Sequence, residues 1–182
     1  MRRLAVAVLL CSTTLASAAP VLYGIGRAPS ASELRALDIS VAPDGTGLPS
    51  GRGTGSEGAA LYQSLCAACH GARGEGVGDF PALVGGIGSL GTSTPVLTVG
   101  SYWPYATTLW DYTRRAMPYM VPGVLTADQV YALTAYVLEL NGVISPETIL
   151  TEATLPRVRM PNRDGFVTDP RPDVPAKGRR AP

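Results

Sequence analysis

Cys66-Ala67-Ala68-Cys69-His70 is the stretch from which the rest of the chain can be understood. Two cysteines separated by two residues and followed at once by histidine form the attachment pattern of c-type haem. Residues three apart lie on one face of a helical turn, so Cys66 and Cys69 can both reach the vinyl groups of one haem. The imidazole of His70 then holds the iron from the proximal side. The motif therefore predicts one covalently attached haem c.

Three other interpretations of the two thiols are a disulfide, a thioredoxin-like redox pair and a zinc site. A zinc site would need two more ligands, and the chain has no other histidine and only one other cysteine, Cys11. A thioredoxin-like pair is expected near a strand–helix unit and does not need the histidine. Haem attachment explains all three residues of the motif, and we favour it.

A sixth ligand for the iron should come from farther along the chain. A thioether sulfur opposite histidine stabilises reduced iron and raises its potential. Met117 and Met120 compete for this role in the proline-rich stretch 115–123, and Met160 is a distant third. We favour Met117, because Pro118 directly after it restricts the backbone. The alternative is that both methionines fill the core and the sixth position stays open, as in a ligand-binding or catalytic haem protein.

The first 18 residues have the pattern of a cleavable signal peptide. A charged Arg2-Arg3 precedes the apolar run 4–10, and Ala16-Ser17-Ala18 is a small-residue cleavage site. The apolar run is too short to span a bilayer, so we expect no membrane span. A lipid on Cys11 is the other interpretation, but Leu10 precedes it where a small residue is expected. Export to the periplasm fits a c-type haem, which is attached outside the cytoplasm in bacteria.

Hydrophobic periodicity predicts an all-α domain over residues 56–142, between an extended N-terminal arm (19–55) and an extended C-terminal arm (143–182). Within the domain we expect helices at about 56–68, 104–115 and 126–141. Smaller elements are a helical turn within 29–38, capped by Ser30 or Ser32, and a short helix within 146–153. The arms are rich in glycine and proline, of which the chain has 21 and 16, and are therefore expected to be irregular.

Capping and stop residues predict where these helices begin and end, and small residues predict where two of them cross. Ser56 is the expected N-cap of the first helix, and Thr126-Ala127-Asp128-Gln129 is a capping-box start for the third, which should stop near Asn141-Gly142. The small residues Ala132 and Ala135 suit a close crossing against the first helix near Gly58. The formal net charge is +1, and no basic run suggests a nucleic-acid partner.

A pattern of Gly58, Tyr62, the CxxCH motif, a later methionine–proline and a closing amphipathic helix resembles the class I cytochrome c fold. A narrower resemblance covers nearly the whole mature chain. It is to the cytochrome subunits of periplasmic sulfite dehydrogenases and to the cytochrome domain of the sulfane dehydrogenase of thiosulfate-oxidising systems. The stretches that carry it are 44–49, 99–109, 115–118 and 160–166.

This resemblance implies roles and partners. It assigns Cys66 and Cys69 to haem attachment, His70 to the proximal position and Met117 to the distal one. In these families a molybdenum-cofactor subunit oxidises the sulfur compound, and electrons pass through the haem to a soluble cytochrome c. The chain would then be the electron-transfer subunit of a heterodimer or larger complex, not its catalytic subunit. Its single haem motif favours the sulfite type, because the sulfane dehydrogenase cytochrome usually has two haems. One alternative is the cytochrome subunit of a sulfane- or thiosulfate-oxidising dehydrogenase. Another is a free-standing diffusible carrier, but such a carrier would not need two long arms.

Overall fold

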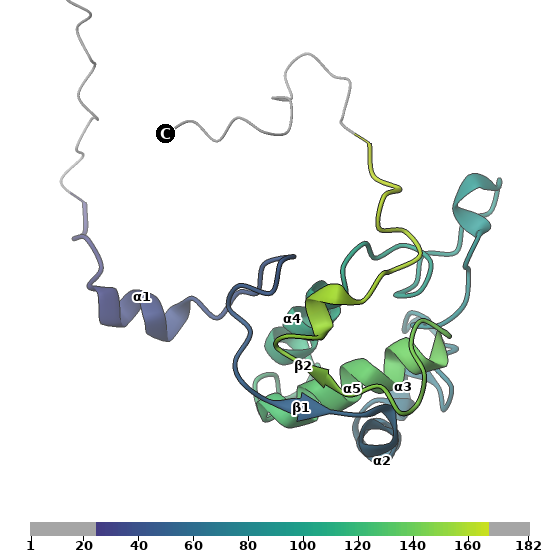
Figure 1. Ribbon diagram of the computed structural model, residues 1–182, viewed down its shortest axis with the longest axis horizontal. Helices are drawn as coiled ribbons and strands as arrows, with labels where there is room; N and C mark the ends of the chain where they lie inside the picture. The colour runs from purple at the N-terminus through teal and green to yellow at the C-terminus, as the bar shows by residue number, and fades with distance from the viewer. Residues whose placement is uncertain (1–24, 168–182) are drawn as a thin grey trace, which may run out of the picture. The chain divides into compact units, whose positions relative to one another are not determined.

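The computed structural model describes residues 25–167, and its contacts divide the chain into two units, residues 1–38 and 39–182. In the first unit, helix α1 spans Ala31–Leu37 (Figure 1). Its N-cap is Ser30, one of the two residues predicted for this position. Glu33 completes a capping box by accepting the backbone N–H of Ser30. None of its residues is buried.

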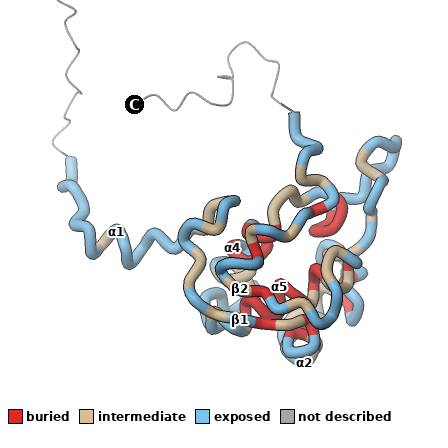
Figure 2. Tube along the Cα trace, viewed as in Figure 1, coloured by how far each residue is buried: buried red, intermediate tan, exposed pale blue. Residues whose placement is uncertain are grey.

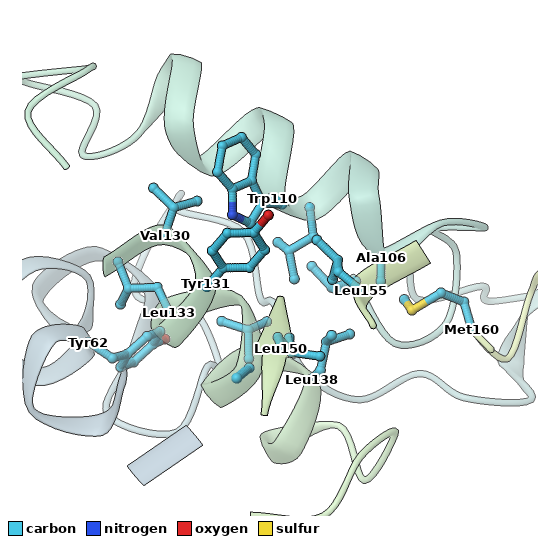
Figure 3. Close-up of a cluster of buried hydrophobic side chains, with 14 residues drawn as sticks. Tyr62, Ala106, Trp110, Val130, Tyr131, Leu133, Leu138, Leu150, Leu155 and Met160 are labelled. Atoms are coloured by element: carbon cyan, nitrogen blue, oxygen red, sulfur yellow. The ribbon is translucent and has the colours of Figure 1, made fainter. Parts of the chain in front are cut away.

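The second unit is a small helical domain built around one helix. Its helices are α2 (Gly55–Leu65), α3 (Ala67–His70), α4 (Ala106–Ala116) and α5 (Ala127–Leu140). Helix α5 contacts both α2 and α4, and eight of its residues are buried. Buried segments are red in Figure 2, and several lie along α5. The core forms around α5, and Trp110 of α4 packs there against the ring of Tyr131, at 5.3 Å between ring centroids (Figure 3). The expected all-α class I cytochrome c fold is confirmed.

Helices α2 and α5 cross closely because one glycine allows it. A Cβ atom at Gly58 would overlap the carbonyl oxygen of Ala132 and lie 2.9 Å from the Cβ of Tyr136. Beside this point the rings of Tyr62 and Tyr136 are 5.2 Å apart. The predicted crossing at Gly58 is therefore present, and it sets the distance between the two helices.

Helix ends were predicted with mixed success. Thr126 and Gln129 form the expected capping box of α5, and Gly142 follows that helix with a φ of +67°. The expected cap of the first helix is wrong. Thr54, not Ser56, accepts the N–H of Glu57, because the glutamate three residues after Thr54 completes a capping box with it. The helix therefore starts earlier, and it breaks at Cys66.

The segments on either side of the helices lie on the domain and pair with each other. Strand β1 (Arg52–Gly53) is antiparallel to β2 (Leu150–Thr151). The helix expected within 146–153 is therefore wrong: Leu150 is fully buried as part of β2, and the Thr151 hydroxyl accepts N–H groups of the following turn. Two short 3-10 turns, η1 (Ser89–Gly91) and η2 (Leu155–Arg157), complete the described part of the chain.

Among residues 25–167, no helix is long and apolar enough to cross a membrane. The predicted signal peptide and the end of the C-terminal arm, residues 1–18 and 168–182, lie outside the described residues. The domain boundaries of the sequence analysis stay a prediction.

Candidate haem site

The CxxCH motif forms one helical turn at the end of α2. Cys66 ends α2 by donating its N–H to the carbonyl of Tyr62 (2.8 Å). Its own carbonyl then accepts the N–H groups of Cys69 (3.1 Å) and His70 (2.9 Å). Both thiols are free and half-buried. The helical turn on which the spacing argument depends is therefore present, with both cysteines open to covalent attachment.

The protonation of Cys66 argues against the thioredoxin-like interpretation. Burial, and secondarily the neighbouring Cys69, raise the pKa of the Cys66 thiol to about 11. Reactive cysteines of redox motifs have a depressed pKa, because the thiolate is the nucleophile. Cys66 is protonated near neutral pH, and its surroundings are those of an apolar attachment point.

His70 is held in the tautomer that a metal ligand needs. Its Nδ1 lies 2.9 Å from the carbonyl oxygen of Pro81. A carbonyl can only accept, so Nδ1 carries the proton and donates it, which leaves the lone pair of Nε2 free to bind a metal. Such a partner on the other ring nitrogen is the usual arrangement of metal-binding histidines, because it fixes the orientation of the ring.

The loop that supplies Pro81 is tied to the motif by backbone bonds. Gly76 donates to the carbonyl of His70 (2.7 Å), and Leu83 donates to Gly74 (2.8 Å). Gly74 has a φ of +79° and no room for a Cβ against Val84, so glycine is required there. Tyr62 of α2 also donates its hydroxyl to the carbonyl of Gly71 (3.1 Å). The orientation of the histidine therefore depends on α2 as well as on the loop.

The three methionines considered as sixth ligand lie in different environments. Met117 is half-buried at the C-cap of α4, where its N–H donates to Thr113 (3.1 Å). Met120, three residues on, is 83% exposed. Met160 is 1% exposed within the hydrophobic core (Figure 3), so its sulfur already has a packing role. Between Met117 and Met120 the assignment stays a prediction.

The loops that follow the motif, within 71–97 and 119–124, leave large apolar side chains uncovered. The exposed members are Val77, Phe80, Ile87, Val96, Leu97, Tyr119, Met120, Val121 and Val124. Apolar surface of this extent usually marks a binding site. Together with the two free thiols and the free Nε2 of His70, it fits a flat apolar group that carries a metal.

Asn141 and Asp111 hold segments around the site together through hydrogen bonds, and the sequence analysis did not predict this role for either residue. Asn141, predicted only as a helix stop, ties the loops to the end of α5: it donates to the carbonyl of Leu83 (3.1 Å) and accepts the N–H of Gly85 (3.3 Å). Asp111 is buried on α4 and accepts the N–H of Val41 (3.0 Å). An acid within an aromatic helix, four residues before Arg115, was the available signal for Asp111.

Comparison with known proteins agrees with this site. The family described as "Cytochrome c" matches residues 55–141. The chain belongs to the cytochrome c family. It is also similar to a chain in the crystal structure of the sulfane dehydrogenase SoxCD from Paracoccus pantotrophus, with 42% identity and a TM-score of 0.76. That match covers 82% of this chain and 73% of the other. No curated protein sequence matches.

Membership of this family implies a covalently bound haem c. The residues described above fit that group, since the thiols, the imidazole and the apolar loops supply what its attachment requires. The chain is therefore an electron-transfer cytochrome c, related to a sulfane dehydrogenase.

Proposed function

We propose that the chain is the electron-transfer subunit of a molybdenum-cofactor dehydrogenase that oxidises a reduced sulfur compound, and that it passes the electrons to a soluble cytochrome c. The supporting observation is the extent of the similarity to SoxCD. It covers 82% of the chain, whereas the cytochrome c family matches residues 55–141, less than half. Similarity to the dehydrogenase therefore includes segments outside the haem domain, which a general electron carrier would not need.

Each site residue has a defined part in this proposal. Cys66 and Cys69 attach one haem through thioether bonds, His70 is the proximal ligand through Nε2, and Met117 is the distal ligand. The bound haem supplies one-electron chemistry at its iron. The Pro81 carbonyl and the Tyr62 hydroxyl keep the imidazole in place, so that its position need not change when the oxidation state does.

Two sulfur substrates of the partner are supported by different observations. The identity of 42% to a sulfane dehydrogenase favours a sulfane sulfur compound. The single CxxCH motif favours sulfite. The proposed location is the periplasm, based on the signal-peptide pattern of residues 1–18. The amino-terminal sequence of the mature protein would test that location, and a start at Ala19 is expected.

The experiment that tests the function is purification of the tagged, haem-loaded chain from its native host. Molybdenum is then measured in the eluate, and the reduced haem absorption band is followed after addition of sulfite or of thiosulfate. Molybdenum with reduction by sulfite alone supports the sulfite type, and molybdenum with reduction by thiosulfate supports the sulfane type. The matched control is C66S/C69S, which should give no haem band.

A molybdenum-free chain that neither compound reduces would contradict the proposal and favour the diffusible carrier. Carbon monoxide provides a separate test of the open-site alternative. A ferrous protein with a methionine ligand should bind it slowly or not at all, whereas an open sixth position should bind it at once.

A further inference from the structure

One carboxylate, that of Asp111 on α4, joins two distant parts of the sequence. Its side chain is only 10% exposed. One oxygen accepts the backbone N–H of Val41 (3.0 Å) and the Nε–H of Arg115 (3.0 Å), and the other pairs with the terminal guanidinium nitrogen of Arg115. A buried carboxylate is stable only where charge and hydrogen bonds compensate for lost water, and both compensations are present here.

The segment that begins at Val41 is held to the helix at a second point. The hydroxyl of Thr107, four residues before Asp111 and so on the same face of α4, donates to the carbonyl of Pro43 (3.3 Å). Farther along, the Pro49 carbonyl accepts the Tyr131 hydroxyl (2.9 Å), and the Arg52 N–H donates to Asp128 (2.8 Å). Residues 41–52 thus connect α4 to α5 through polar bonds.

These bonds have a consequence for the two sides of the haem site. Helix α5 packs against α2, which ends at the CxxCH motif, so the position of His70 follows that of α5. Met117 follows α4, because it caps the helix two residues after Arg115. The relative position of α4 and α5 therefore sets the distance between the two proposed ligands, and Asp111 is a buried polar link that holds α4 in place.

We infer that Asp111 is a positioning residue for the distal ligand: by binding the Val41 N–H it fixes the middle of α4 and thereby places the Met117 sulfur, at the C-cap of the same helix, for the iron. The inference rests on the proposed role of Met117. Arg115 supplies the charge that compensates the buried carboxylate, but it lies on the same helix and so does not join α4 to another segment. The backbone tie to Val41 is the important contact.

The test compares the haem-loaded variants D111A, D111N and R115M with the parent. Two readouts report the sulfur–iron bond, the weak far-red charge-transfer band of ferric protein and the midpoint potential. D111A should lose most of the band and have a lower potential. D111N, whose amide oxygen can still accept the Val41 N–H, should lose less of the band. R115M keeps the bond to Val41 and should keep the band and the potential, although it should melt at a lower temperature because the buried carboxylate loses its charge partner.

Two controls separate the possible outcomes. D164N removes the same charge from an exposed pair with Arg159, where the Asp164 side chain is 74% exposed, and should change neither readout. M117A should abolish the band. If M117A keeps it, the ligand assignment fails. If M117A loses it while D111A and D111N keep the parent's band and potential and only melt at lower temperature, Asp111 is merely structural and the inference is wrong. Should D111A not fold, the comparison of D111N with R115M decides: a band and potential equal to the parent's in both variants would overturn the inference.

Discussion

The proposed proximal and distal sides of the haem site are built in different ways. On the proximal side, Cys66, Cys69 and His70 are adjacent in sequence, and backbone hydrogen bonds join their turn to the loop at 71–84. On the distal side, Met117 lies at the end of a helix, followed by a loop whose residues 119–121 are exposed. The turn of the motif is held by bonds between neighbouring residues, whereas the helix that ends at Met117 is tied at Asp111 to Val41, 70 positions earlier.

The largest effect should follow from removing the proximal attachment. C66S/C69S leaves His70 and its bond to Pro81 in place but abolishes both thioether bonds. We expect complete loss of covalent haem, measured by haem staining after denaturing electrophoresis. Haem that survived denaturation in this variant would contradict the attachment site.

Removing the proposed distal ligand should have a smaller effect than removing the thiols, because the haem stays attached. M117A should keep its covalent haem, lose the far-red sulfur band and show a lower midpoint potential, since a soft sulfur ligand favours reduced iron. M120A is the matched control, because Met120 is 83% exposed and only three residues away. A loss of the band in M120A with retention in M117A would reverse the assignment.

The proximal side should also be sensitive at a residue far from the chemistry. G58V places a branched side chain against the backbone of Ala132 and the Cβ of Tyr136, so α2 must move away from α5. We expect the free energy of unfolding to fall by about 3 kcal/mol, measured by denaturant titration. S64A, at an exposed residue of the same helix, should stay within about 0.5 kcal/mol of the parent.

The difference between local and long-range contacts explains which features could be predicted from the sequence. The haem motif, the capping box at Thr126 and the crossing at Gly58 depend on nearby residues or on small side chains, and each was predictable. The strand at Leu150 was not, because it exists only through pairing with β1, about 100 residues earlier. Asp111 is similar: nothing local indicates that its partner is the N–H of Val41.

A smaller effect should come from the cap of α2. T54A removes the side-chain oxygen that accepts the Glu57 N–H, so we expect a loss of about 1 kcal/mol in the free energy of unfolding. S56A should be close to neutral, because Thr54 and not Ser56 is the cap. A larger loss in S56A than in T54A would show that the helix begins where the sequence first suggested.

The smallest effect should be a pH dependence from the same capping box. The Thr54 hydroxyl and backbone N–H lower the pKa of Glu57 below its usual value. A carboxyl whose pKa is lower in the folded protein than in the unfolded chain adds stability above the unfolded pKa, about 4.3, and this stability is lost as the pH falls through the folded pKa. Denaturant titrations between about pH 6 and pH 3 should therefore show a shallower decline in E57Q than in the parent. Because Glu57 lies at the surface, salt should weaken the difference, and identical slopes in the two proteins would mean that the carboxylate does not contribute to the cap.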